Sequence, residues 1–151
     1  MPTIAELPWQ KPDIMSQYPH MLTMDAVVWS AFLRELSPAL DRVAYDVHVG
    51  TPMPVPAGSS PMQLRIAAGI SRKRIDVVAD TGKALWVIEV KPYGNHQACG
   101  QALQYHHLFV AEYSPPPPCL AVIVCAEHDP DINDLARQHD IRIIDVAVTD
   151  F

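Results

Sequence analysis

The chain has 151 residues, of which 49% are apolar and 19% charged, and its formal net charge is −6. This length and composition predict one globular domain with a real hydrophobic core. No stretch approaches the ~20 apolar residues that cross a membrane, and the N-terminus lacks a basic-then-apolar signal, so we expect a cytoplasmic protein. The negative charge argues against broad, non-specific binding to nucleic acid.

The three cysteines, Cys99, Cys119 and Cys125, are an odd number and have no CxxC spacing. This pattern argues against a disulfide framework and against a structural zinc site. We therefore expect three packed thiols.

Residues 1–22 carry four prolines together with Trp9, Tyr18 and several methionines. We interpret this segment as an irregular arm, not a separate fold, that packs either on the domain or on a second subunit. Residues 23–151 are assigned to a single domain.

A helix is predicted over residues 23–36, because Thr23 is a suitable N-cap residue and Pro38 stops the helix. Glu35 falls on the same stripe as the apolar side chains of this helix and is expected to point inward. The alternative is a carboxylate that snorkels at the helix end or forms an ion pair there.

Residues 41–50 alternate apolar and polar side chains and predict a half-buried strand. Residues 51–70 follow, with four prolines between Pro52 and Pro61. A proline-rich loop of this length in a compact domain is usually functional or partly disordered. We expect a substrate flap or a contact between subunits, with residues 62–70 forming a short strand or a turn of helix.

A β-hairpin is predicted near the middle of the chain. Residues 75–79 and 84–90 are rich in β-branched and aromatic side chains, and the Asp-Thr-Gly-Lys segment between them is typical of a turn. A two-residue turn at its centre would place Asp76 opposite Val87, whereas a three-residue loop with a bulge would reverse the parity of the facing side chains.

Three charged side chains would then converge on one face of the hairpin. Glu89 and Lys91 share a strand face, and the pairing puts Asp76 diagonal to Glu89. Two carboxylates and a lysine are costly on a sheet face unless they are paired or bind something. The set is either a partly exposed Glu89–Lys91 ion pair, with Asp76 in solvent, or a site for a hard cation such as Mg²⁺. In a cation site, Lys91 would orient or deprotonate a water that attacks a phosphodiester.

A second helix is predicted over residues 95–112, after a Pro-Tyr-Gly break. Gln97, Gln101 and Gln104 lie on one face of it. This glutamine stripe is either plain solvent exposure or brings Gln101 to the charged site, and we favour the second interpretation.

The remaining elements complete an α/β order. Residues 119–126 are a continuous apolar run, as in a strand that is buried on both faces. A short helix over residues 129–139 and a last strand over residues 141–148 follow. The order predicts a three-layer α/β domain with one mixed sheet covered by helices.

Asp76, the Glu89-Val90-Lys91 motif and the glutamine-bearing helix after it together resemble the PD-(D/E)xK nuclease superfamily, which has a restriction-endonuclease-like fold. In that family, an acidic residue on one strand precedes (D/E)-x-K on the next antiparallel strand. Ile75 stands where the family usually has a proline. In element order, the resemblance covers residues 25–148.

The resemblance implies an endonuclease that uses Mg²⁺ or Mn²⁺ to hydrolyse phosphodiester bonds in DNA or another nucleic acid. Asp76, Glu89 and the main-chain carbonyl of Val90 would bind the metal. The residues implied for catalysis are Asp76, Glu89, Lys91 at the attacking water, and Gln101 and Glu35 in support. The competing hypothesis is a catalytically inactive module that keeps the nuclease fold and acts in nucleic-acid binding or protein assembly.

A run of basic residues precedes the site. Arg72, Lys73 and Arg74 either form a nucleic-acid-binding strip beside the acidic pocket or are merely solvated. Cutting both strands of a duplex with one metal centre per chain normally requires two centres. We therefore predict a homodimer that uses the N-terminal arm, the proline-rich loop or both.

Overall fold

The computed structural model describes residues 1–36 and 40–149. The helices are α1 (Thr23–Leu36), α2 (Pro61–Ser71), α3 (His96–Tyr113) and α4 (Asn133–Gln138), with 3₁₀ turns η1 (Ile4–Glu6) and η3 (Pro130–Ile132). The strands are β1 (Trp9–Gln10), β2 (Arg42–Val49), β3 (Lys73–Asp80), β4 (Leu85–Gly94), β5 (Cys119–His128) and β6 (Ile141–Asp145).

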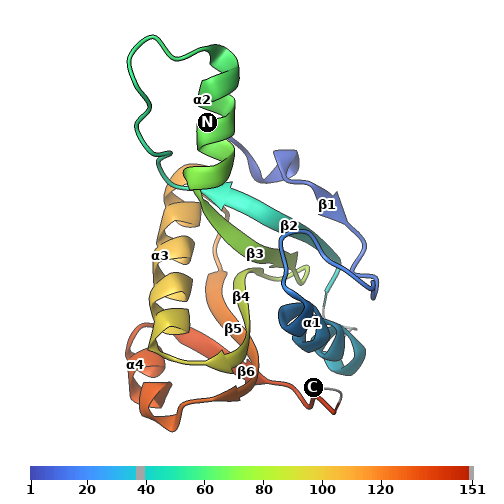
Figure 1. The fold of residues 1–151 in the computed structure, drawn as a ribbon. Helices are drawn as coiled ribbons and strands as arrows, with labels where there is room; N and C mark the ends of the chain where they lie inside the picture. Colours follow the sequence, from blue (N-terminus) through green and yellow to red (C-terminus); the bar gives the residue numbers. More distant parts are fainter. Residues whose placement is uncertain (37–39, 150–151) are drawn as a thin grey trace.

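The strands of the described residues form one six-stranded sheet in chain order, β1 to β6 (Figure 1). The pairs from β1 to β4 are antiparallel, whereas β4, β5 and β6 are parallel. Helix α1 covers one face, and α3 and α4 cover the other. This arrangement confirms the predicted three-layer α/β architecture with a mixed sheet.

Each face of the sheet has its own apolar layer. On the α1 face, Trp29 and Phe32 are fully buried and stack with their ring centroids 4.9 Å apart. The Trp29 indole N–H donates to the Tyr45 hydroxyl at 2.9 Å, which satisfies the one polar group of a buried ring. On the other face, Phe109 of α3 is fully buried. Burying a side chain of this size contributes about 2–3 kcal/mol, so these rings fix both helices on the sheet.

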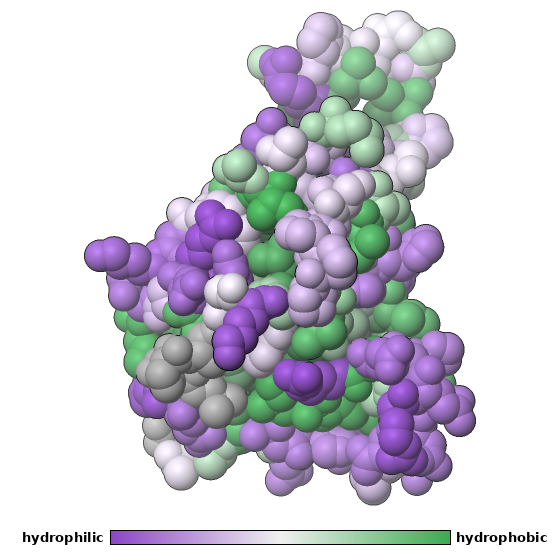
Figure 2. Space-filling view, turned by 180° about the vertical axis from the view of Figure 1, so that it is seen from behind, coloured by the Kyte–Doolittle hydropathy of each residue, from purple (hydrophilic) through white to green (hydrophobic). Residues whose placement is uncertain are grey.

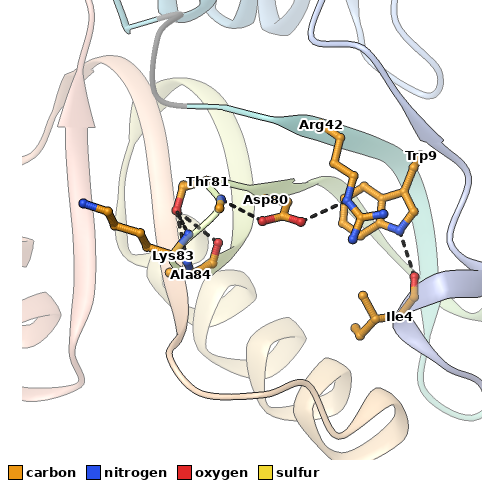
Figure 3. A network of polar contacts seen from close by, with 8 residues as sticks. Ile4, Trp9, Arg42, Asp80, Thr81, Lys83 and Ala84 are labelled. Atoms are coloured by element: carbon orange, nitrogen blue, oxygen red, sulfur yellow. Dashed lines mark hydrogen bonds and ion pairs between the residues drawn. The ribbon is translucent and has the colours of Figure 1, made fainter.

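The turn between β3 and β4 is wider than predicted. Asp80 pairs with Leu85, which leaves four residues in the connection. The Asp80 carboxylate accepts from the Gly82 N–H at 2.9 Å, and Thr81 Oγ1 accepts from the Ala84 N–H at 3.0 Å (Figure 3). These side chains close a four-residue turn that a two-residue hairpin rule does not anticipate.

The wider turn shifts the strand register by two positions. Val77 pairs with Ile88, and continuing this register places Asp76 across from Glu89. The predicted pairing of Asp76 with Val87 is therefore wrong. Because strand side chains alternate with a period of two, a shift of two positions keeps Asp76 and Glu89 on a common face.

The arm of residues 1–22 packs on its own sheet. Trp9 lies in β1, which pairs with β2, and the Arg42 guanidinium stacks 4.0 Å from the centre of the Trp9 ring (Figure 3). Tyr18 is buried, and its hydroxyl shares a 2.7 Å hydrogen bond with Ser30 of α1. The arm thus adds a strand and a buried ring to the domain.

Helix α2 projects from the body of the molecule (Figure 1). Ser60 caps its start by accepting from the Gln63 N–H at 3.1 Å, and Pro61 occupies the first turn. It is a regular helix of 11 residues, longer than the short strand or single turn expected, and none of its residues is buried.

Two strand ends differ from the predictions. Strand β4 continues through the Pro-Tyr-Gly segment, where Tyr93 pairs with Glu127 and Gly94 with His128. The parallel partner β5 supplies the hydrogen bonds that keep this segment extended. Strand β6 ends at Asp145, earlier than expected.

Among the described residues, no helix is both long enough and apolar enough to cross a membrane.

Candidate active site

The charged residues predicted as a site lie where β3 and β4 separate. The paired ladder of the two strands ends at Val77 and Ile88. Beyond it, the Val90 N–H donates to Asp76 Oδ2 at 2.9 Å, so a side chain takes the place of a backbone acceptor. This bond fixes the Asp76 carboxyl between the two strands, beside Glu89.

Asp76 and Glu89 face a cavity of about 330 Å³ that also holds Lys91 and Gln101. Burial raises the pKa of Asp76 to about 6. Burial, and then the adjacent Asp76 charge, raise the pKa of Glu89 well above its ordinary value. Two adjacent buried carboxyl groups resist ionising together, so both favour the protonated form more than isolated carboxyl groups do.

Two buried oxygen atoms in this cavity, Glu89 Oε1 and Gln101 Oε1, have no hydrogen-bond partner. An unpaired buried polar atom costs about 1–3 kcal/mol, and such atoms are rare in folded proteins. Hard divalent cations take carboxylate and amide oxygens as ligands. The residues therefore fit a Mg²⁺-class ion, which usually keeps several waters and would supply partners for these oxygen atoms directly or through such a water.

Lys91 supplies positive charge next to the acidic pair and favours the ionised forms of Asp76 and Glu89. Within residues 1–36 and 40–149, its ammonium forms no hydrogen bond or direct ion pair, so it remains available to a ligand. Asp25, in the first turn of α1, lies close enough for Lys91 to lower its pKa, although burial raises that pKa more. Asp25 is thus the α1 carboxylate whose charge interacts with Lys91, Asp76 and Glu89, although it does not line the cavity.

Glu35 does not join this group, and the expectation that it points inward is wrong. Its side chain is exposed, and its carboxylate accepts from the Ala147 N–H at 3.3 Å. It lies ten residues after Asp25 on α1, which is roughly 15 Å along the helix axis. Sequence reasoning passed over Asp25 because an acidic residue in the first turn is already explained by the helix dipole.

Helix α3 brings Gln101 and Tyr105 to the cavity, one turn apart. Burial, followed by the charges of the acidic pair, raises the Tyr105 pKa, whereas the neighbouring Gln101 side chain lowers it. Gln97 and Gln104 are exposed. The predicted glutamine stripe therefore divides into one site residue and two surface residues.

The three basic residues predicted to contact nucleic acid line the same cavity. Arg72 donates to Glu112 Oε2 at 2.9 Å, and Arg74 donates to both carboxylate oxygens of Asp46 at 2.7 and 2.6 Å. These ion pairs neutralise two of the three charges. Lys73 forms no ion pair with the described residues, so the positive strip available to a phosphate is narrower than predicted.

Comparison with solved structures finds a repair endonuclease from Pyrococcus abyssi at 12% sequence identity and a TM-score of 0.52. The fold is similar to that of a repair endonuclease. The match covers 89% of this chain and 50% of the endonuclease, so the chain spans about half the length of that protein. A protein of unknown function matches at 15% identity and a TM-score of 0.47, over 80% of this chain and 56% of that one. No protein-family model and no curated protein matches the sequence.

A larger hollow of about 770 Å³ lies between α3, α4 and β6. Its lining has no buried carboxylate and no unpaired buried polar atom. A functional site is recognised by converging polar groups rather than by volume, and this criterion selects the cavity of Asp76 and Glu89.

Proposed function

We propose that the protein is a metal-dependent nuclease of the PD-(D/E)xK type that hydrolyses phosphodiester bonds, with DNA as its expected substrate. The observation that carries this proposal is the buried Asp76–Glu89 pair beside Lys91, with Glu89 Oε1 and Gln101 Oε1 unpaired. Buried acids with strongly raised pKa values cluster at functional sites. The similarity of the fold to a repair endonuclease supports the same class of activity.

Asp76, Glu89 and the main-chain carbonyl of Val90 would hold Mg²⁺ or Mn²⁺. When bound, such an ion supplies Lewis acidity at the phosphate and lowers the pKa of the attacking water. Lys91 Nζ orients that water and offsets the negative charge that develops on the phosphate. The amide of Gln101, which lines the cavity one turn before Tyr105, positions the reacting groups from the α3 side.

We further propose that residues 23–151, with the N-terminal arm packed on them, form the nuclease domain and that it works as a homodimer through α2. Met62, Ile66 and Ile70 recur at every fourth position of α2 and are 62%, 56% and 77% exposed. Figure 2 shows hydrophobic residues on this projecting part, at the top of the view. The helix has a single charged residue, Arg65, so its surface suits a second copy better than nucleic acid.

The test is cleavage by the purified full chain of supercoiled plasmid, linear duplex, single-stranded DNA and RNA, each in Mn²⁺, Mg²⁺ or chelator. Asp76→Ala and Lys91→Ala should each lower the rate at least ~100-fold, the usual range for loss of an acid–base or electrostatic group. Glu127→Gln and Lys83→Ala are matched controls, since both side chains are exposed and lie outside the cavity.

Nicking of the closed plasmid that requires metal and disappears in both site variants would establish an endonuclease. Activity that survives in Asp76→Ala and Lys91→Ala would overturn the proposal. The inactive-module alternative predicts no cleavage of any substrate by the wild-type chain, together with nucleic-acid binding or self-association.

A further inference from the structure

A second group of ligand-type side chains lies at the carboxyl ends of the parallel strands. Cys125 and His128 belong to the end of β5, and Asp145 is the last residue of β6. One ligand atom from each of the three lies within 4.8 Å of the others. None of the three lines the cavity of Asp76 and Glu89, so this group is separate from the proposed nuclease site.

The three side chains already share two protons. The Cys125 thiol donates to Asp145 Oδ1 at 3.1 Å, and His128 Nδ1 donates to the same oxygen at 2.8 Å. One divalent cation carries the charge of two protons and could replace both. Bond lengths in tetrahedral zinc sites set ligand atoms roughly 3.3–3.7 Å apart, so Cys125 Sγ and His128 Nδ1 would each move about half an ångström away from Asp145 Oδ1.

The surroundings hold these ligands as a metal site requires. His128 Nε2 donates to Asn133 Oδ1 at 2.8 Å, which orients the ring and leaves Nδ1 directed at Cys125 and Asp145. Metal-binding histidines almost always donate their other ring N–H in this way. Gly94 leaves room for the group, since a Cβ there would lie 3.2 Å from His128 Cβ and 3.4 Å from Cys125 Sγ.

The ligands differ in how far their side chains are exposed to solvent. Cys125 is fully buried, whereas the Asp145 side chain is 48% exposed. A cation could therefore enter from the Asp145 side and keep a water as its fourth ligand. A thiolate, an imidazole and a carboxylate together favour Zn²⁺ over Mg²⁺, which prefers oxygen ligands alone.

We propose that Cys125, His128 and Asp145 form a second metal site, which takes a zinc-class divalent cation. Binding releases the Cys125 thiol proton and the His128 Nδ1 proton to solvent, while Asp145 stays a carboxylate. The ion ties the end of β5 to the end of β6. The cysteine spacing predicted no structural zinc, because a mixed ligand set drawn from two strand ends leaves no CxxC signature.

The test uses the purified full chain with Co²⁺ as the probe, because a Co²⁺–thiolate bond gives a charge-transfer band in the near ultraviolet. We expect one equivalent of Co²⁺ to produce this band and Zn²⁺ to abolish it by displacement. The carboxylate cavity has no cysteine in its lining, so the band reports the second site alone. Absence of a thiolate band in the wild-type chain would overturn the proposal.

Variants identify the cysteine that gives rise to the band. Cys125→Ser should lose it, whereas Cys119→Ser, which removes another thiol of the same strand, should keep it. Asn133→Ala changes an exposed residue that touches no metal and should weaken Zn²⁺ binding about 10- to 100-fold. Asp76→Asn should leave Zn²⁺ affinity at the second site unchanged. A band that survives Cys125→Ser, or an affinity unaffected by Asn133→Ala, would contradict the assignment.

Discussion

Asp76 destabilises the metal-free protein at neutral pH. Its folded pKa of about 6 lies above the ordinary value of 3.8, so the folded state binds the proton more tightly than the unfolded state does. The resulting stabilisation is fully present below about pH 4 and is lost as the pH rises through 6. At pH 7.5, the buried pair holds more negative charge than its surroundings compensate, and a cation would relieve this cost.

Asp76→Asn should therefore stabilise the protein in chelator at pH 7.5 while abolishing activity. We expect a gain of about 1–3 kcal/mol, or roughly 3–10 °C in Tm for a chain of this size. At pH 4 the two proteins should unfold at similar temperatures, because Asp76 is then protonated. Thermal unfolding followed by circular dichroism gives both values. A lower Tm for Asp76→Asn at pH 7.5 would contradict this account, and the exposed Asp131→Asn is the control.

Asp25 and Glu35 offer a matched comparison on one helix. Asp25 lies near Lys91, whereas Glu35 is exposed and bonds Ala147. Removing a carboxylate charge that stabilises a nearby ammonium without contacting it costs on the order of 1 kcal/mol in a partly buried site, which is about 5- to 10-fold in rate. Asp25→Asn should lower the cleavage rate by that factor, and Glu35→Gln should leave it unchanged. Equal rates for the two variants would remove Asp25 from the site.

The sequence was sufficient to predict that the side chains of Asp76, Glu89 and Lys91 converge, because strand alternation survives an error of two in the register. It was not sufficient to choose between Asp25 and Glu35. The apolar stripe of a helix shows which of its sides packs on the sheet. It does not show which of the two helix ends lies near the point where β3 and β4 separate. That choice depends on packing against β4 and β5, which are distant in the chain.

At the scale of elements, α2 is a projecting helix with no buried residue (Figure 1). Its last residue, Ser71, lines the cavity of Asp76 and Glu89, and β3 begins two residues later. An isolated helix of 11 residues is marginal in water, so a stable α2 needs a partner surface. Pairing of two α2 helices would provide it and would bring two cavities into one particle.

If the proposed homodimer forms through α2, Ile66→Glu should convert it into a monomer. The substitution places a charge in the middle of the exposed apolar stripe of α2, where burial against a second copy becomes costly. Light scattering at micromolar concentration should give about twice the 16.7 kDa chain mass for the wild type and the chain mass for the variant. Leu135→Glu, at an exposed residue of α4, should remain dimeric. A wild-type monomer would contradict the proposal.

Elements with local signals were predictable from the sequence, and elements made by distant pairing were not. The Ser60 cap and Pro61 mark the start of α2, although its length was underestimated. Strand β1 has two residues and exists only because β2 lies beside it. The extension of β4 past Pro92 likewise depends on the parallel pairing with β5, which contributes hydrogen bonds that no local pattern reveals.

At the scale of the whole molecule, an acidic chain surrounds a small, partly basic cavity. The net charge of −6 and the pairing of Arg72 and Arg74 leave Lys73 and Lys91 to meet a phosphate. Long-range attraction to nucleic acid should therefore be weak. Tight engagement would depend on the cation and on a second subunit rather than on a basic surface.

The most direct measurement is calorimetric titration of Mg²⁺ into the purified full chain at pH 7.5. Mg²⁺ is chosen because it favours the oxygen ligands of Asp76, Glu89 and Val90 and disfavours the thiolate of the second site. The account predicts one Mg²⁺ bound per chain with a Kd of about a millimolar or tighter, and loss of that binding in Glu89→Gln but not in Glu127→Gln. Absence of Mg²⁺ binding to the wild-type chain, or binding that Glu89→Gln leaves intact, would contradict it.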